Sequence, residues 1–284
     1  MADSIPRDRA EPSTLVPSSW FGAYVFDLDG TIYLGDELLP GAGQLVTALR
    51  KARLPVRFLS NNPTRDPAAY ADKLTRLGLP AATDEIVNTL VVTTRWLLRE
   101  MPDAVVFPIG APALEQALVS AGLKVSEDPA EIDVVLASYD QALSYRKLQI
   151  AFDALWFHGR ARLLATNPDR YCPLPGGRGE PDTAATVAAI EAATEVPCER
   201  TFGKPDPAML EIALDGLGVA PADVLMVGDR LHTDIALAHA AGASSGLVLT
   251  GDSGLRDLDA TPAAQRPDFV LERIDELLPD HDGS

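Results

Sequence analysis

Residues 24–31, Tyr-Val-Phe-Asp-Leu-Asp-Gly-Thr, decide the fold of this chain. Three apolar residues run directly into an acidic pair and a glycine, a pattern that predicts a buried strand ending in a turn. Because side chains alternate along an extended chain, Asp27 and Asp29 are predicted to lie on the same side of it. The stretch therefore predicts two carboxylates at the end of a core strand.

Strands and helices alternate on both sides of this stretch. A strand is predicted at 56–60, followed by a helix that Asp66 caps and that ends before Gly78. Near the end of the chain, a strand at 224–227, a helix at 232–241 and a strand at 246–249 repeat this order. The order predicts an α/β fold, a Rossmann-like, doubly wound parallel sheet with helices on both faces.

The middle of the chain, from about residue 84 to 200, has strands and helices of its own. Strands are expected at 105–108, 134–138 and 163–165, and helices at 89–99, 113–121, 145–157 and 183–193. A stretch of this size is too long to be a loop. We therefore predict a polar N-terminal tail at 1–20, a core domain formed by 21–83 and 201–284, and an inserted α/β cap domain at 84–200.

Composition excludes several classes of protein. The chain has 284 residues, of which 46% are hydrophobic and 23% charged, with a net charge of −17. Such acidity disfavours binding to nucleic acid or to anionic membranes. The two cysteines fit a reducing compartment, and no apolar run is long enough for a signal peptide or a membrane helix. We therefore expect a cytoplasmic protein without a nucleic-acid or membrane partner.

A second predicted strand also ends in an acid. The strand at 224–227 leads through a glycine into Asp229, and Asp234 follows five residues later at the start of a helix. In an open α/β sheet, ligands bind outside the carboxyl ends of the strands, so these acids are expected to meet Asp27 and Asp29. Four carboxylates would repel one another, and a hard divalent cation, Mg²⁺ above all, would offset that repulsion.

Hydroxyl and amino groups near the same edge indicate a site for an anion. Thr31 follows the first acidic pair, and Ser60 ends the strand at 56–60. Lys204 precedes a helix that begins near Pro207, a position from which a lysine can hold a phosphate. The acids, the hydroxyls and the lysine together predict a site for a phosphate group and a metal ion.

Four of these segments together resemble the four motifs of the haloacid dehalogenase superfamily. They are residues 27–31 (DLDGT), 58–62 (FLSNN), 203–205 (GKP) and 228–234 (GDRLHTD). The large insertion between the second and third motifs, and the stretch 166–169 (TNPD) inside it, resemble the class IIA members of the superfamily. That class includes the NagD-like, 4-nitrophenyl phosphatase and phosphoglycolate phosphatase proteins.

The resemblance implies a Mg²⁺-dependent phosphomonoesterase that acts through an aspartyl-phosphate. Its substrates would be small phosphorylated metabolites such as sugar or polyol phosphates, and 4-nitrophenyl phosphate in vitro. Asp27 would be the nucleophile and Asp29 the acid and base of the reaction. The carboxylates of Asp27 and Asp229 and the carbonyl of Asp29 would hold Mg²⁺, with Asp234 acting indirectly, and Thr31, Ser60, Asn61 and Lys204 would hold the phosphate.

The inserted cap is where the resemblance places the choice of substrate. Four residues that follow a predicted strand could face the leaving group: Asn167, Asp169, Arg170 and Tyr171. A solvated loop is an equal alternative. Relatives of this class often pair through their caps, which implies that a homodimer can form.

Other functions remain open on the residues alone. A phosphotransferase or mutase would use the same core, and a receiver-type signalling module would use Asp27 as a phosphorylated switch. Asp29 and the large insertion argue against the switch, since a switch needs no acid and base for hydrolysis. A catalytically silent binding protein is disfavoured because all the motif residues are present.

Overall fold

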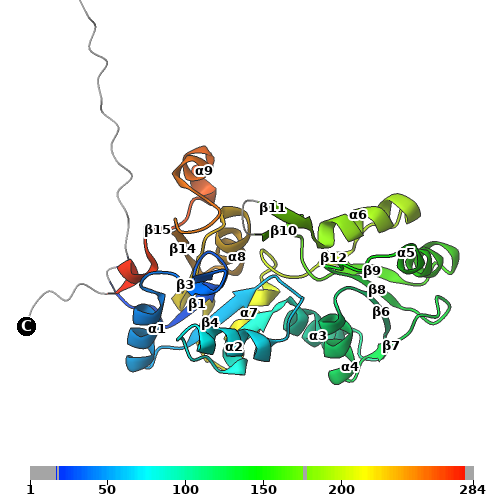
Figure 1. Ribbon diagram of the computed structural model, residues 1–284, viewed down its shortest axis with the longest axis horizontal. Helices are drawn as coiled ribbons and strands as arrows, with labels where there is room; N and C mark the ends of the chain where they lie inside the picture. Colours follow the sequence, from blue (N-terminus) through cyan, green and yellow to red (C-terminus); the bar gives the residue numbers. More distant parts are fainter. Residues whose placement is uncertain (1–16, 18, 175–177, 279–284) are drawn as a thin grey trace, which may run out of the picture.

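The structure, a computed structural model, describes residues 17, 19–174 and 178–278 and contains two parallel sheets that lie side by side (Figure 1). The larger sheet belongs to the core and the smaller one to the inserted cap. Of the predicted N-terminal tail, only residues 17, 19 and 20 lie within the described part. No helix in the described ranges is long and apolar enough to cross a bilayer.

The core sheet has six parallel strands in the order β15-β14-β13-β1-β4-β5. They are β1 (Ala23–Asp27), β4 (Val56–Ser60), β5 (Ile86–Asn88), β13 (Val224–Gly228), β14 (Ser244–Val248) and β15 (Phe269–Leu271). The order grows outward from β1 in both directions, which is the doubly wound topology that the sequence predicts. β1 and β13 are therefore neighbours at the point where the strand order reverses.

Alternating side chains of β1 point to the two faces of the core sheet. One set, which includes Phe26, joins helices α1 and α2 in one apolar cluster, and the other, which includes Val25, joins α7 and α8. These helices are α1 (Ala42–Lys51), α2 (Pro67–Arg76), α7 (Ala208–Leu214) and α8 (Ala236–Ala241). Both faces of the sheet are thus covered, as a buried parallel sheet requires.

The core sheet extends beyond residue 83, where the sequence predicts the first core segment to end. β5 pairs in parallel with β4 and forms the edge of the sheet, so residues 86–88 belong to it. A strand of three residues has too few positions to show a hydrophobic period, which is why the sequence does not reveal it. Helix α3 (Thr89–Glu100) then leads from β5 into the cap.

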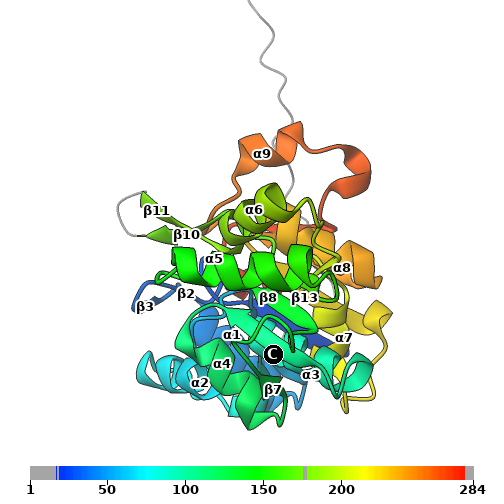
Figure 2. The ribbon, with the colours of Figure 1, turned by 90° about the vertical axis from the view of Figure 1, so that its right-hand side faces the viewer.

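The cap is built around five parallel strands in the order β12-β9-β8-β6-β7. They are β6 (Val105–Ile109), β7 (Lys124–Val125), β8 (Val134–Ala137), β9 (Arg162–Ala165) and β12 (Arg200–Thr201). Helices α3 and α4 (Pro112–Ser120) pack on one face, and α5 (Tyr145–Phe152) and α6 (Thr183–Thr194) pack on the other (Figure 2). The α3 side shares one apolar cluster with the core.

Several elements differ in form from the prediction. The helix predicted at 145–157 is α5 followed by a π-helical turn, Asp153–Phe157, and the helix predicted at 232–241 is a π-helical turn, Leu231–Ile235, followed by α8. Two antiparallel hairpins were not predicted: β2 (Tyr33–Leu34) with β3 (Glu37–Leu38), and β10 (Tyr171–Leu174) with β11 (Arg178–Pro181). The described elements also include helix α9 (Leu255–Ala260) and 3-10 turns at Thr83–Glu85, Pro221–Asp223, Ala263–Gln265 and Ile274–Leu277.

Candidate active site

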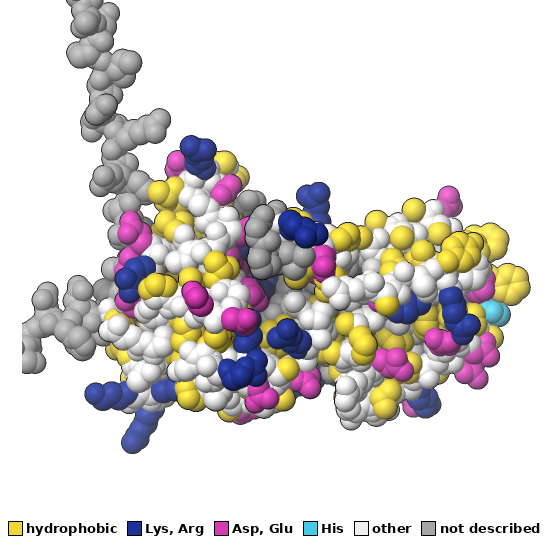
Figure 3. Space-filling model, viewed as in Figure 1, with side chains coloured by type: hydrophobic (Ala, Val, Ile, Leu, Met, Phe, Trp, Pro, Cys, Tyr) yellow, Lys and Arg dark blue, Asp and Glu magenta, His cyan; other side chains and the backbone are white. Residues whose placement is uncertain are grey.

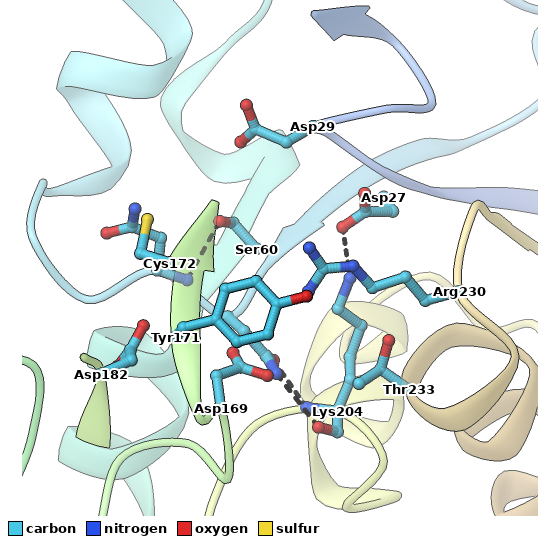
Figure 4. Close-up of a pocket in the computed structure, with 12 residues that line it drawn as sticks. Asp27, Asp29, Ser60, Asp169, Tyr171, Cys172, Asp182, Lys204, Arg230 and Thr233 are labelled. Atoms are coloured by element: carbon cyan, nitrogen blue, oxygen red, sulfur yellow. Dashed lines mark hydrogen bonds and ion pairs between the residues drawn. The ribbon is translucent and has the colours of Figure 1, made fainter. Parts of the chain in front are cut away.

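The residues that the sequence singles out meet at the carboxyl ends of β1 and β13. Asp27 ends β1, and Asp229 directly follows β13. Ser60 ends β4, and Lys204 lies in the stretch after β12 (Figure 4). A cavity of about 130 Å³ lies at this edge. Its place fits the general rule that open α/β sheets bind ligands where the strand order reverses.

Three buried carboxylates form a compact cluster beside this cavity. One oxygen each of Asp27, Asp229 and Asp234 lies within 4.8 Å of the other two. Asp229 Oδ2 accepts the backbone N–H of Asp252 at 2.7 Å, and Asp234 Oδ2 accepts the N–H of Arg230 at 3.1 Å. The structure therefore brings together three of the four acids that the sequence assigns to a metal.

Lys204 lies between two of these acids. Its Nζ contacts Asp27 Oδ1 and lies 2.6 Å from Asp234 Oδ1, and its side chain is only 4% exposed. Burial lowers the pKa of Lys204, but the carboxylates of Asp234 and Asp27 outweigh burial, so the net shift is upward. The amine is therefore charged, and one buried cation contacts a cluster of three carboxyl groups.

Burial, with repulsion from neighbouring carboxylates, raises the pKa values of Asp27 and Asp229. Burial raises the pKa of Asp27 well above its usual range; Lys204 opposes this shift, and the charges of Asp234 and Asp229 add to it. Burial, followed by the charge of Asp234, raises the pKa of Asp229 to about 6. Such shifts are typical of a site where negative charge exceeds positive charge and where a bound cation would favour the ionised carboxylates.

The donor set of the cluster fits a divalent metal ion. Asp229 Oδ1 is buried and has no hydrogen-bond partner among the described residues. Gly30, with φ +87°, lies so close to Asp229 that a Cβ at this position would collide with Asp229 Oδ2. A cluster of carboxylate oxygens with an unsatisfied member is the environment that hard cations such as Mg²⁺ prefer.

Asp29 lies apart from the cluster and lines the cavity. Its surface is exposed to the cleft, and one carboxylate oxygen accepts the Tyr33 hydroxyl at 3.2 Å. The protein that surrounds the cleft still desolvates the carboxylate, and this burial raises the pKa of Asp29 against the opposing charge of Lys73. A carboxyl group with a raised pKa that faces a cavity is suited to donate and accept a proton.

The predicted phosphate-binding residues reach the cavity unequally. Ser60, Asn61 and Lys204 line it, and Ser60 Oγ accepts the N–H of Asn62 at 3.2 Å. The side-chain amide of Asn61 is bonded to the backbone of Lys204. Thr31 does not line the cavity: it is fully buried, and its hydroxyl has no partner among the described residues.

The cap contributes a loop to the cavity. Asp169 lines it, whereas Arg170 is exposed and lines a neighbouring cavity. Asn167 is buried, and its Nδ2 donates to the carboxylates of Asp169 and Asp182, both at 3.3 Å, and to the Asn61 carbonyl at 3.2 Å. Of the four predicted cap residues, Asp169 and Tyr171 therefore line the cavity, Asn167 supports it and Arg170 lies outside it.

Several lining residues are absent from the sequence-based set. They are Asn62, Cys172, Asp182, Arg230 and Thr233. Hairpin β10–β11 carries Tyr171 into the site (Figure 4), and a hairpin interrupted by prolines and glycines gives little strand pattern in the sequence. Asp182 was detectable, because an Asp-Thr pair before an alanine-rich run indicates the N-cap of a helix, as α6 shows.

Comparison with known proteins places this site in a family. Family models described as "Haloacid dehalogenase-like hydrolase" and "HAD-hyrolase-like" match residues 24–124 and 201–277. An acid sugar phosphatase of Staphylococcus epidermidis is 34% identical over 241 residues, which span 84% of this chain and 91% of the relative.

Solved structures agree with this placement. The crystal structure of a 4-nitrophenylphosphatase from Thermotoga maritima superposes with a TM-score of 0.85 at 33% identity, over 90% of this chain and 96% of that one. NagD from Escherichia coli K-12 superposes with a TM-score of 0.80 at 25% identity, over 91% and 98% of the two chains. The chain therefore belongs to the haloacid dehalogenase-like hydrolases, as a phosphatase of their NagD-like class IIA group.

Proposed function

We propose that this chain is a Mg²⁺-dependent phosphatase that hydrolyses small sugar or polyol phosphates, and 4-nitrophenyl phosphate in vitro, through an aspartyl-phosphate. The observation that carries the proposal is the position of Asp27, which contacts Lys204 and lies beside Asp229 and Asp234 at a cavity. The relatives named for sugar phosphates and for 4-nitrophenyl phosphate support the choice of substrates.

The two acids of the first motif perform different steps. An oxygen of Asp27 attacks phosphorus, the bond from phosphorus to the substrate oxygen breaks, and Asp29 protonates that oxygen as it leaves. Asp29 then takes a proton from water, whose oxygen attacks the phosphorus of the aspartyl-phosphate. Inorganic phosphate departs, and the Asp27 carboxylate is restored.

The surrounding residues hold the reacting groups. The carboxylates of Asp27 and Asp229 and the carbonyl of Asp29 would bind Mg²⁺, with Asp234 acting indirectly, and the bound ion would supply positive charge against the carboxylates and the phosphate. Lys204, Ser60 and the backbone N–H groups after Ser60 would hold the phosphoryl oxygens. A phosphate-binding role for Thr31 stays a prediction that the proposal does not use, since its buried hydroxyl does not line the cavity.

We assign the chemistry to the core and the choice of substrate to the cap. The predicted core is 21–83 with 201–284, to which the sheet adds β5, and the predicted cap is 84–200. Asp169 supports this division, because it is a cap residue that lines the cavity beside the core acids. A role for Arg170 and the cytoplasmic location stay predictions.

A screen of phosphate release over phosphorylated metabolites tests this function. We expect release from sugar or polyol phosphates and from 4-nitrophenyl phosphate in Mg²⁺, and its loss after removal of the metal by a chelator. Return of the phosphoryl group to a second position of the substrate without free phosphate would indicate a mutase. Full turnover in the chelator would refute the metal requirement.

We also propose a homodimer that forms through the cap. Helix α5 and the following turn expose Tyr145 (82%), Trp156 (60%) and Phe157 (71%), and Figure 3 shows apolar side chains gathered at this end of the cap. Exposed aromatic groups of this kind often mark interfaces. Light scattering should give a dimer for the protein and a monomer for Trp156→Ser; a wild-type monomer at high concentration would exclude the dimer.

A further inference from the structure

We propose that Asn61 is a positioning residue that fixes Lys204 through its side-chain amide. The inference rests on the proposed function, because it concerns how Lys204 is held beside Asp27. The N–H of Lys204 donates to Asn61 Oδ1 at 2.7 Å, and Asn61 Nδ2 donates to the carbonyl of Lys204 at 3.1 Å. A donor and an acceptor on one planar group fix both the place and the orientation of the backbone they face.

Lys204 needs such an anchor because of where it lies in the chain. Only Phe202 and Gly203 separate it from β12, the last strand of the cap sheet. This stretch is also the second of the two connections between cap and core. A movement of the cap would therefore reach the Lys204 Nζ, which contacts Asp27, unless the backbone between them is held.

The packing at Gly203 shows how closely the two segments approach. Gly203 has a φ of +81°, and a Cβ at this position would stand 2.8 Å from Asn61 Oδ1 and 2.8 Å from Thr89 Cγ2. Both the backbone conformation and the lack of space require glycine here. The amide of Asn61 is thus packed directly against the turn that carries Lys204.

The main chain of Asn61 makes a different set of bonds from its side chain. Its carbonyl accepts Thr89 Oγ1 at 3.1 Å and Asn167 Nδ2 at 3.2 Å. Thr89 begins α3, the first connection from core to cap, and Asn167 supports the cap loop that holds Asp169. Substitutions of the Asn61 side chain therefore remove the bonds to Lys204 without removing the carbonyl that serves the cap.

A double-mutant cycle on kcat tests whether Asn61 acts through Lys204. With 4-nitrophenyl phosphate and saturating Mg²⁺, Asn61→Ala should lower kcat by about 10–100-fold and change KM little, since a misplaced catalytic group costs rate. Added to Lys204→Ala, it should cost nothing further, because no amine remains to be positioned. Losses that multiply, or a normal kcat for Asn61→Ala, would overturn the inference. A normal kcat for Lys204→Ala would instead remove the proposed function of Lys204.

Two further variants separate positioning from loss of structure. In Asn61→Asp, the protonated carboxyl can accept and donate as the amide does, whereas the ionised form cannot donate. Its kcat relative to wild type should rise severalfold between about pH 7 and pH 4, where about half of an aspartate with its ordinary pKa is protonated, while the ratio for Asn61→Ala stays flat. A flat ratio for both variants would contradict the inference.

Thr89→Val is the matched control, because it removes a bond to the Asn61 carbonyl and leaves the bonds to Lys204 in place. We expect its kcat to stay within about threefold of wild type, with thermal unfolding confirming that each variant is folded. A loss as large as that of Asn61→Ala would mean that the turn as a whole, rather than the amide, sets the rate.

Discussion

Asp27 and Asp29 lie two residues apart, yet their environments suit them to different tasks. Asp27 is buried against Lys204 within the acid cluster. Asp29 has an exposed surface that faces the cleft, and the protein around the cleft desolvates its carboxyl group and raises its pKa. Lys204 and a metal ion bound to the cluster would favour the ionised Asp27 that attack requires, whereas Asp29 faces the cleft and can exchange a proton there. The chemistry thus depends on where β1 ends, more than on any property of aspartate.

We predict that Asp29→Asn affects substrates according to their leaving group. An alkoxide leaving from a sugar phosphate needs a proton, so its kcat should fall by about 10²–10⁴-fold. Nitrophenolate hardly needs one, so 4-nitrophenyl phosphate should give a burst of nitrophenol followed by slow turnover. Stopped-flow absorbance measures both phases. A sugar phosphate turned over within tenfold of the wild-type rate would contradict the role of Asp29.

Most residues of the site lie on loops, and the strands that precede these loops fix their positions. The segment after β13 closes on itself, because Asp234 N–H donates to the Arg230 carbonyl at 3.0 Å while the Asp234 carboxylate accepts the Arg230 N–H. The loop after β9 is supported from behind by Asn167, which is bonded both to Asp169 and to the core. A change in that loop should therefore affect selection more than chemistry.

For Asp169→Ala we predict a loss of selectivity. The kcat/KM for a sugar phosphate should fall by an amount that corresponds to about 1–3 kcal/mol of transition-state stabilisation, the usual effect of losing a polar contact. The kcat/KM for 4-nitrophenyl phosphate should fall far less. Asp128→Ala, at an exposed cap carboxylate before β8, is the control and should change neither. Equal losses on both substrates would show that the loop supports structure and that selection occurs elsewhere.

Some strands of this fold can be predicted from the sequence, and others cannot. Strands β1, β4, β13 and β14 were predicted because each contains a short stretch of apolar residues beside a turn signal. β5 and hairpin β10–β11 were not, since three residues carry no period and prolines and glycines interrupt the hairpin. The position of Tyr171 after a predicted strand made it a candidate, but no local pattern records the strand pairing that brings it to the site.

The core acids illustrate the same limit at the site. Asp27, Asp229 and Asp234 were expected together, because parallel strands end at one edge of a sheet. The side-chain bonds of Asn61 to Lys204, 143 residues away, could not be expected, because they depend on how the chain returns from the cap. Sequence patterns thus located the acids but not the contacts that hold the lysine.

In the whole molecule, core and cap share one apolar cluster but join at a strongly charged site. That cluster includes Val25 of the core sheet and Val106 of the cap sheet. The site between them concentrates buried carboxyl groups that outnumber the single cation Lys204, and these groups oppose folding when they are ionised without a metal ion. The stability of the metal-free protein should therefore depend on pH through these groups.

We predict that the metal-free protein loses stability as pH rises from about 4 to 6. The pKa of Asp229 is about 6 in the folded protein and about 3.9 in an unfolded chain, so the folded state binds more protons in this window. Unfolding then releases protons, and raising the pH favours unfolding, by about 1–3 kcal/mol. Thermal unfolding in a chelator should show a falling Tm. Mg²⁺ should raise Tm more at pH 7 than at pH 4; a rising Tm in the chelator would contradict the pKa shift.

The most direct test of the account is to capture the phosphoryl group on Asp27. Asp29→Asn should be mixed with 4-nitrophenyl phosphate and Mg²⁺, quenched in acid within the burst, and digested for mass spectrometry. The peptide that contains Asp27 should gain about 80 Da, one phosphoryl group, and Asp27→Asn should gain nothing and lose activity. An unmodified Asp27 peptide during the burst, together with turnover by Asp27→Asn within tenfold of wild type, would contradict the central claim.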